Sequence, residues 1–253
     1  MGTYVVTGGA SGIGSAIKEQ LQSEGHKVLV VDIQNADIEA NLGTAEGRTE
    51  AITAIREATT DGLAGLVVCA GVGSHVPDKG LILSVNYFGK IELVIGLQDV
   101  LAANNSSVLL VSSNSAPMDT NPAYVDALLA LDEPTATEIA QDMDAQQVYS
   151  GSKQAVTRWM RANTGAYAAQ GIRINAIGPG YTRTPLSAAV EDNPDYGDAI
   201  KQFIATIPVG RPGVPEDMAN AASFLLSDKA SFICGSMLFV DGGHDAVMRP
   251  DGF

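Results

Sequence analysis

Tyr149 and Lys153 stand four residues apart in the string Tyr-Ser-Gly-Ser-Lys, so on a helix their side chains would share one face. A free tyrosine has a pKa of about 10 and is a poor acid or base at neutral pH. A lysine one turn away, together with a bound pyridinium cation, would favour the phenolate and suit the phenol to proton transfer. The same spacing also occurs in chance surface pairs, so the interpretation depends on the rest of the chain.

A glycine-rich turn near the start of the chain supplies that context. It follows a strand-like run at 4–6 and precedes a helix-like run at 15–24, and a second strand-like run at 27–31 ends in Asp32. Strand, glycine turn, helix, strand and acid is the order of a dinucleotide-binding site rather than of a flexible loop. The glycines allow a tight bend and a close approach of the pyrophosphate, and the helix N-terminus attracts its phosphates. The residues that we expect to bind the cofactor here are Gly8, Ser11, Gly12, Ile13 and Gly14.

Asp32 indicates which nicotinamide cofactor this turn would select. A carboxylate can accept hydrogen bonds from both hydroxyls of the adenosine ribose, and it would repel the 2′-phosphate of NADP. The neighbours that could neutralise such a phosphate, Ser15, Ile33 and Gln34, are not basic. The sequence therefore predicts NAD(H) as the cofactor.

Strand-like and helix-like runs alternate along the chain, which predicts an α/β fold with right-handed crossovers. We expect a single-domain, Rossmann-type, doubly wound parallel sheet. In such sheets the ligand lies beyond the carboxyl ends of the strands, where Gly8, Asp32, Ala70-Gly71, Ser113 and Pro179-Gly180 would converge. The expected strands are 3–7, 27–32, 65–70, 107–112, 172–177, 237–241 and a weak one near 37–41. The expected helices are 12–24, 44–59, 86–103, 148–169 and 215–227.

The composition bounds the class of protein and its partners. The 253 residues contain no Pro/Gly/Ser-rich linker, which favours one domain over residues 1–253. A net charge of −14 disfavours nucleic acid and anionic membranes as partners. No apolar run reaches about 18 residues, and the first strand begins too early to leave room for a signal peptide. Cys69 and Cys234 are expected to be free thiols in the core of a cytoplasmic protein, and the histidines lack metal-ligand spacing, so we expect no metal.

Taken in order, these motifs resemble the short-chain dehydrogenase/reductase family over essentially the whole chain. Ala70-Gly71 matches the last two residues of the family's Asn-Asn-Ala-Gly motif. Ser113 is the second serine of a Val-Ser-Ser string and matches the family's catalytic serine. The resemblance implies that Asn86, Ser113, Tyr149 and Lys153 are catalytic. It also places further residues at the cofactor: Asn41 and Leu42 near the adenine, and Pro179, Gly180, Thr182 and Thr184 near the nicotinamide.

The resemblance implies a concrete reaction. Tyr149 would donate a proton to the oxygen of a carbonyl that receives a hydride, and Ser113 would hold the same oxygen. Lys153 would favour the phenolate and bind the nicotinamide ribose, and Asn86 would position a water that links Lys153 to solvent. Plainer interpretations stay open: Ser113 as a backbone cap at a strand end, Asn86 as a helix cap or kink, and Thr182 and Thr184 as turn residues.

The chain departs from the family pattern at three places. Cys69 stands where the family usually has asparagine, so we expect one interstrand polar tie to be missing. Asn41 stands where an aspartate usually meets adenine, which predicts a weaker contact. An insert at 114–148 separates Ser113 from Tyr149 and carries two helix-like runs, 123–131 and 134–143. Pro122 and Pro134 are placed well to start these helices.

Within the family, three features are similar to the bacterial 3α-hydroxysteroid dehydrogenase/carbonyl reductases: the short gap from Gly71 to Asn86, the long insert, and the tail from Asp241. Coniferyl-alcohol-type dehydrogenases also have a long insert, so an aromatic alcohol dehydrogenase is an alternative. The segment 181–208 corresponds to the family's lid over the substrate. Its apolar residues favour an apolar alcohol or ketone such as a steroid, a cyclic ketone or an aryl ketone. They are Leu186, Tyr196, Phe203 and Ile204.

Two other classes of function fit less well. Sugar-nucleotide epimerases and dehydratases can share the Tyr-x-x-x-Lys spacing, but they usually have a different glycine spacing and a longer C-terminal domain. A non-catalytic dinucleotide-binding protein would usually lack one of the catalytic residues. We further expect a homodimer formed through the C-terminal elements at 215–241, because the insert would obstruct an interface built from 86–103 and 148–169.

Overall fold

The structure is a computed structural model that describes residues 2–184 and 197–252, with the side chains of residues 197–200 left out. Within these residues, all strand pairs of the sheet are parallel, and the strand order is β3-β2-β1-β4-β5-β6-β7. The order changes direction between β1 and β4, which is where doubly wound folds bind their ligands. The predicted fold class is confirmed. The strands are β1 (Thr3–Thr7), β2 (Lys27–Asp32), β3 (Ile38–Glu39), β4 (Gly65–Val68), β5 (Ser107–Val111), β6 (Arg173–Pro179) and β7 (Met237–Val240).

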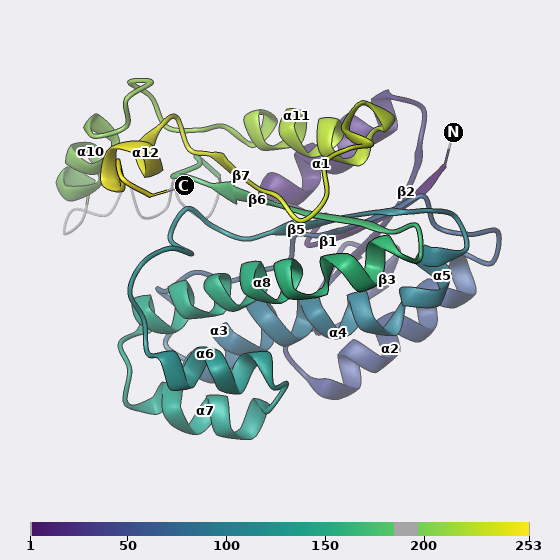
Figure 1. The fold of residues 1–253 in the computed structure, drawn as a ribbon, viewed down its shortest axis with the longest axis horizontal. Helices are drawn as coiled ribbons and strands as arrows, with labels where there is room; N and C mark the ends of the chain where they lie inside the picture. Colours follow the sequence, from purple (N-terminus) through teal and green to yellow (C-terminus); the bar gives the residue numbers. More distant parts are fainter. Residues whose placement is uncertain (1, 185–196, 253) are drawn as a thin grey trace.

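Helices cover both faces of the sheet (Figure 1). One face is covered by α1 (Gly12–Ser23) and α11 (Pro215–Leu226), which pack on each other. The other face is covered by α2 (Ala45–Ala58), α4 (Gly89–Gly96) and α8 (Ala145–Ala168). The strands β4 and β5 are buried at every residue because both of their faces lie under helices.

The insert forms a further layer outside α8 (Figure 1). It contains α6 (Pro122–Leu129) and α7 (Glu133–Gln141), which pack on α8 and on α3 (Lys79–Leu83), respectively. Both predicted helices are present, and each has its proline in the first helical turn.

The single helix predicted at 86–103 is wrong. The chain is helical from Lys79, where the Asp78 side chain accepts the N–H of Leu81 at 3.2 Å. A π-helical turn, Ser84–Phe88, then separates α3 from α4, and α5 (Gln98–Ala102) follows a break at Leu97. The apolar pattern is continuous across these boundaries, so it could not locate the π turn, a device common at functional sites.

Other elements differ from expectation at their ends. The strands β4 and β5 stop before the predicted 70 and 112, β6 continues to Pro179, and α8 begins earlier because the Asp144 side chain caps it through the N–H of Gln147. Two helices at the C-terminal end were not placed from sequence: α10 (Gly197–Ala205) and α12 (His244–Met248). The 3-10 turn Asp228–Ala230 follows α11.

Cys69 and Cys234 are free thiols, as expected, but each is only half-buried. Both were expected to be core residues: Cys69, just after β4, packs against the core, whereas Cys234 lies in the loop before β7. In the described part of the chain, no helix has the length and apolar character needed to cross a membrane.

Candidate active site

A cleft of about 1410 Å³ opens at the carboxyl ends of the strands. Its wall contains the predicted residues of the glycine turn, Asp32, Asn41, Leu42, Ala70 and Gly71. It also contains Ser113, Tyr149, Lys153, Pro179, Gly180, Thr182 and Thr184. Asn86 is the one predicted site residue that does not line it. The topology therefore gathers segments separated by more than a hundred residues into one site.

The glycine turn adopts the geometry that a dinucleotide needs. Gly8 and Gly12 have φ angles of +70° and +55°, in the left-handed region that favours glycine. A Cβ on Gly14 would lie 2.1 Å from the carbonyl oxygen of Gly8, so only glycine lets α1 approach β1 this closely. The N-cap residue Ser11 makes no side-chain cap bond, which leaves the first N–H groups of α1 for a phosphate. These features fit a pyrophosphate.

Asp32 ends β2 with its carboxylate held in place by backbone. Its Oδ2 accepts the N–H of Ala10 at 3.0 Å, and its Oδ1 accepts the N–H of Ile33 at 2.7 Å. Each oxygen keeps a second lone pair that can accept a ribose hydroxyl. The exposed side chain of Ile33 lies on the adjoining wall and offers no positive charge to a 2′-phosphate.

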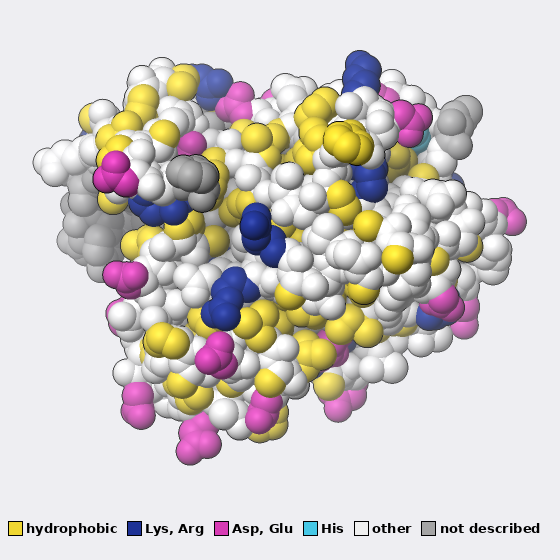
Figure 2. Space-filling view, in the orientation of Figure 1, with side chains coloured by type: hydrophobic (Ala, Val, Ile, Leu, Met, Phe, Trp, Pro, Cys, Tyr) yellow, Lys and Arg dark blue, Asp and Glu magenta, His cyan; other side chains and the backbone are white. Residues whose placement is uncertain are grey.

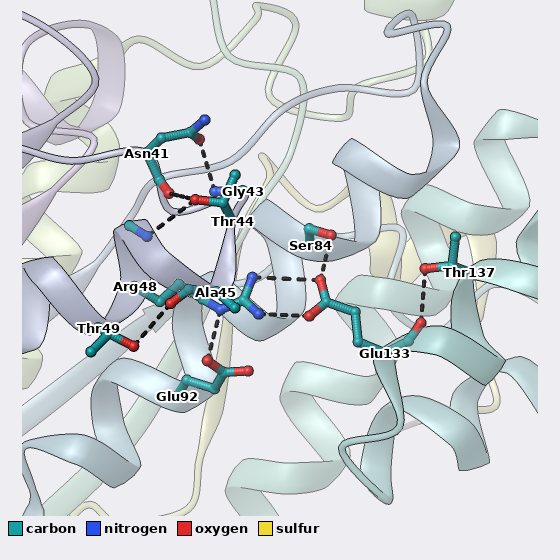
Figure 3. Close-up of polar contacts among 11 residues, drawn as sticks. Asn41, Gly43, Thr44, Ala45, Arg48, Thr49, Ser84, Glu92, Glu133 and Thr137 are labelled. Atoms are coloured by element: carbon teal, nitrogen blue, oxygen red, sulfur yellow. Dashed lines mark hydrogen bonds and ion pairs between the residues drawn. The ribbon is translucent and has the colours of Figure 1, made fainter.

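The turn after β3 contributes Asn41 and Leu42 to the cleft wall, and Figure 3 shows the polar contacts within this turn. The Oδ1 of Asn41 accepts the N–H of Gly43 at 3.0 Å, and the Asn41 carbonyl accepts the N–H of Thr44 at 3.2 Å. Thr44 then caps α2 by accepting the N–H of Gly47 at 3.1 Å. Asn41 is thus used to shape the turn, and its contact with adenine stays a prediction.

Ser113, Tyr149 and Lys153 meet in the cleft wall, where the end of β5 and the helix α8 come together. Ser113 lies just beyond β5, and the other two lie on the first turns of α8, with the Lys153 Nζ 5.4 Å from the centre of the Tyr149 ring. Lys153 is buried, and its Nζ reaches the Val111 carbonyl at 3.5 Å. The predicted helical pair is therefore present and faces the cleft.

Asn86 lies in the π turn and is fully buried. Its side-chain amide donates to the carbonyl of Val72 and accepts the N–H of Val72, both at 2.9 Å, so it fixes the turn after β4. A Cβ on Gly71 would lie 2.9 Å from the Asn86 Oδ1 and 3.4 Å from the Lys153 Nζ. Asn86 and Lys153 thus meet at Gly71, and the water between Lys153 and solvent stays a prediction.

Lys90 was missed by sequence reasoning. Its Nζ donates to the carbonyl of Val68 at 2.8 Å and to that of Ala70 at 2.6 Å, and the residue is fully buried. The end of β4, where Cys69 was expected to leave a polar tie missing, is therefore tied by this amine. Burial and then the nearby Lys153 ammonium hold the pKa of Lys90 well below its usual range. The available signal was a lysine between the apolar pair Tyr87-Phe88 and the apolar Ile91, in a run that was predicted to be helical.

The nicotinamide end is built from the segment after β6. The Thr182 hydroxyl donates to the Gly180 carbonyl at 3.0 Å, and Thr182 also pairs with Gly213. The Thr184 methyl would lie 3.6 Å from a Cβ on Gly12, so this segment closes over the glycine turn. Two of the apolar residues of the predicted lid, Leu186 and Tyr196, lie outside the described residues.

The substrate end of the cleft has an aromatic and apolar wall. The Phe203 ring of α10 meets the rings of Tyr181 and His244 edge-on, with centroids 6.0 and 4.9 Å apart. Exposed methionines, Met118 from the insert and Met248 from α12, extend this wall. The contributions of α12 and the insert were missed, because nothing in their sequences shows that they turn towards the cleft. His75 is exposed and also lines the cleft. Among residues 2–184 and 197–252, no three His, Cys, Asp or Glu side chains group as metal ligands.

Comparison with known proteins agrees with this architecture. The family model described as enoyl-(acyl carrier protein) reductase matches residues 8–245. The chain belongs to the short-chain dehydrogenase/reductase family, and it is an oxidoreductase that binds a nicotinamide dinucleotide.

Several individual relatives are similar over their full length. The 3-alpha-hydroxysteroid dehydrogenase/carbonyl reductase of Comamonas testosteroni is 38% identical, with 100% of both chains covered. The cis-4-hydroxycyclohexanecarboxylate dehydrogenase of Sinomonas cyclohexanicum is 30% identical, with 96% of each covered. The crystal structure of the 3-alpha-hydroxysteroid dehydrogenase from Pseudomonas sp. B-0831 complexed with NADH is 42% identical and superposes with a TM-score of 0.93, over 99% of this chain and 100% of that one.

Proposed function

We propose that this chain is an NAD(H)-dependent oxidoreductase that interconverts a secondary alcohol and a ketone on an apolar, steroid-like, cyclic or aryl substrate. The observation that carries the proposal is a single cleft with Asp32 and the glycine turn at one end and Ser113, Tyr149 and Lys153 at the other. The names of the relatives from Comamonas and Sinomonas, a hydroxysteroid and a hydroxycyclohexane dehydrogenase, support a cyclic substrate.

The dinucleotide would lie along the floor of this cleft. The N–H groups at the start of α1 would bind the pyrophosphate, Asp32 the adenosine ribose, and Thr182 and Thr184 the nicotinamide carboxamide. Ribose binding by Asp32, beside an uncharged Ile33, supports NAD(H) over NADP(H). A bound nicotinamide supplies the hydride chemistry, and the residues of the chain supply orientation and the proton.

The proton would come from Tyr149. In the reductive direction its hydroxyl donates to the substrate oxygen as negative charge develops there, and Ser113 donates a second hydrogen bond to the same oxygen. Lys153, buried beside the ring, stabilises the phenolate left behind and holds the nicotinamide ribose. In the oxidative direction the phenolate accepts the alcohol proton. Asn86, through the water described above, would link Lys153 to solvent.

The walls of the substrate end favour apolar rings. Phe203, Tyr181 and the exposed Met118 and Met248 offer apolar contacts that suit a hydrocarbon skeleton. We assign residues 1–253 to one catalytic domain, with the insert at 114–148 and the segment 181–208 as its lid. The free thiols of Cys69 and Cys234 support a reducing compartment such as the cytoplasm.

The assembly that we propose is a homodimer through α11 and β7. Phe224, Phe232 and Leu238 are exposed there, and Figure 2 shows hydrophobic side chains gathered over α11 and the turn after it. Leu225 and Leu226, in contrast, belong to the core. The insert packs on α8, and this supports an interface away from that helix.

The test is oxidation of NADH by the purified chain against a panel of steroid, cyclic and aryl ketones, with NADPH assayed in parallel. We expect turnover with a cyclic or steroid ketone and a preference for NADH. Because the matching family model is described as an enoyl reductase, an enoyl thioester belongs in the panel. Turnover of that thioester alone would contradict the proposal.

A further inference from the structure

The hydroxyl of Ser113 is an acceptor inside the protein. Its Oγ accepts the N–H of Ser115 at 3.1 Å and the hydroxyl of Ser115 at 3.0 Å. A serine hydroxyl has two lone pairs and one proton. Both lone pairs are therefore occupied by Ser115, and the one remaining capacity of Ser113 is to donate its proton.

The surroundings of Ser113 direct that proton into the cleft. Ser113 and Ser115 are 7% and 8% exposed, and both line the cleft wall. The turn that carries them is fixed by two backbone bonds, from Ala116 N–H to the Ser113 carbonyl at 3.1 Å and from Asn114 N–H to the Pro179 carbonyl at 3.0 Å. The neighbouring Ser112 behaves differently, since its hydroxyl donates to the Lys153 carbonyl at 2.9 Å.

We propose that Ser115 is a positioning residue that makes Ser113 a hydrogen-bond donor to the substrate oxygen. The proposal rests on the role of Ser113 in the proposed function. A serine at a strand end could equally donate to a nearby carbonyl and present a lone pair to the substrate. With both lone pairs occupied, Ser113 can only donate, and a donor stabilises negative charge on the substrate oxygen. No proton is transferred by either serine, because Tyr149 remains the acid.

The test compares Ser115→Ala, Ser115→Cys and Ser115→Thr with Ser113→Ala and the double variant Ser113→Ala/Ser115→Ala. We expect Ser115→Ala and the weakly donating Ser115→Cys to lower kcat about three- to tenfold, the size of one neutral hydrogen bond. KM for the cofactor and its affinity by fluorescence titration should not change. Ser115→Thr, which keeps the hydroxyl, should return kcat to within about twofold of wild type. Ser150→Ala, which removes a serine bonded only within α8, is the matched control.

The double variant shows whether Ser115 acts on kcat through Ser113 or through the general structure of the turn. In the Ser113→Ala background, Ser115→Ala should have no further effect on kcat, because there is no hydroxyl left to orient. A fully active Ser113→Ala would contradict the proposed function itself. If Ser113→Ala is impaired while Ser115→Ala matches wild type, or if the two losses multiply, the role of Ser115 is overturned. Thermal melting of each variant reports folding independently of turnover.

Discussion

The guanidinium of Arg48 on α2 lies 2.6 Å from the carboxylate of Glu133 on α7, although the two residues are 85 positions apart. The same guanidinium bonds Glu92 of α4 at 2.7 Å, and the Ser84 hydroxyl donates to Glu133 at 2.5 Å (Figure 3). Arg48 is only 2% exposed. The insert is therefore joined by a buried ionic network to the helix that follows the adenine turn and to the π turn that carries Asn86.

Replacing Arg48 with methionine should destabilise the protein by about 2–4 kcal/mol, because it leaves two partly buried carboxylates without their cation. Arg56→Met is the matched control on the same helix. Its pair with Asp99 is exposed, and its loss should cost less than about 1 kcal/mol. Urea unfolding of the three proteins measures the difference. If both variants lost the same free energy of unfolding, the network around Arg48 would stabilise the protein no more than the exposed pair does.

Tyr149→Phe should lower kcat by about 10²–10⁴-fold, because the proton donor is lost while the ring still packs. The affinity for NADH, measured by fluorescence titration, should stay close to that of wild type. Tyr87→Phe is the control, since the Tyr87 hydroxyl is buried and has no hydrogen-bond partner in the described part of the chain. That variant should keep full activity and should not lose stability. Wild-type kcat in Tyr149→Phe would remove this tyrosine from the mechanism.

The double variant Asp32→Ser/Ile33→Arg should shift the ratio of kcat/KM for NADH over NADPH towards NADPH by about 10–150-fold. This range corresponds to one charge-assisted hydrogen bond between the new arginine and the 2′-phosphate. Gln34→Ala serves as the control for disturbance of the same loop. A wild-type enzyme that already prefers NADPH would contradict the role given to Asp32.

Lys90 should make stability depend on pH. Because its pKa is lowered in the folded protein, the unfolded chain binds more protons between that value and about 10.4, so raising the pH through this window favours folding. The unfolding free energy of wild type should therefore rise relative to that of Lys90→Met between pH 7 and pH 9.5, by at most about 1.4 kcal/mol per pH unit. Lys27→Met, at an exposed lysine, should show no such trend. A constant difference between wild type and Lys90→Met would mean that folded and unfolded Lys90 titrate alike.

Phe232→Glu should convert the proposed dimer into monomers, because it replaces the most exposed apolar side chain of the proposed interface with a charge. Leu131→Glu, at an exposed apolar residue of the insert, is the control and should leave the dimer intact. Light scattering after gel filtration measures both masses. Cross-links that map to 86–103 and 148–169 in the wild type would place the interface elsewhere.

The sequence was most informative where local chemistry and chain order coincide. Gly8, Gly14 and Asp32 can be recognised from the few residues around each of them. The parallel sheet then brings them into one cleft with Ser113 and Tyr149. The residues that the sequence did not reveal share one property: their roles depend on tertiary contacts with segments distant along the chain or folded back by a turn. Lys90 supports the site only because the carboxyl end of β4 faces it, and Ser115 only because the turn after β5 folds back on Ser113.

The π turn at Ser84–Phe88 makes this part of the chain sensitive to a change in length. A π turn contains one residue more than the α-helical turn that it replaces, so deleting a single residue there restores a regular helix. Residues on either side of the deletion would then differ in direction by about 100° around the helix axis. Asn86 and Lys90 lie on opposite sides of the C-terminal end of this turn, so one such deletion could not keep the contacts of both with the segment 68–72. A one-codon deletion would therefore release the segment that follows β4, whose residues Ala70, Gly71 and Val72 line the cleft.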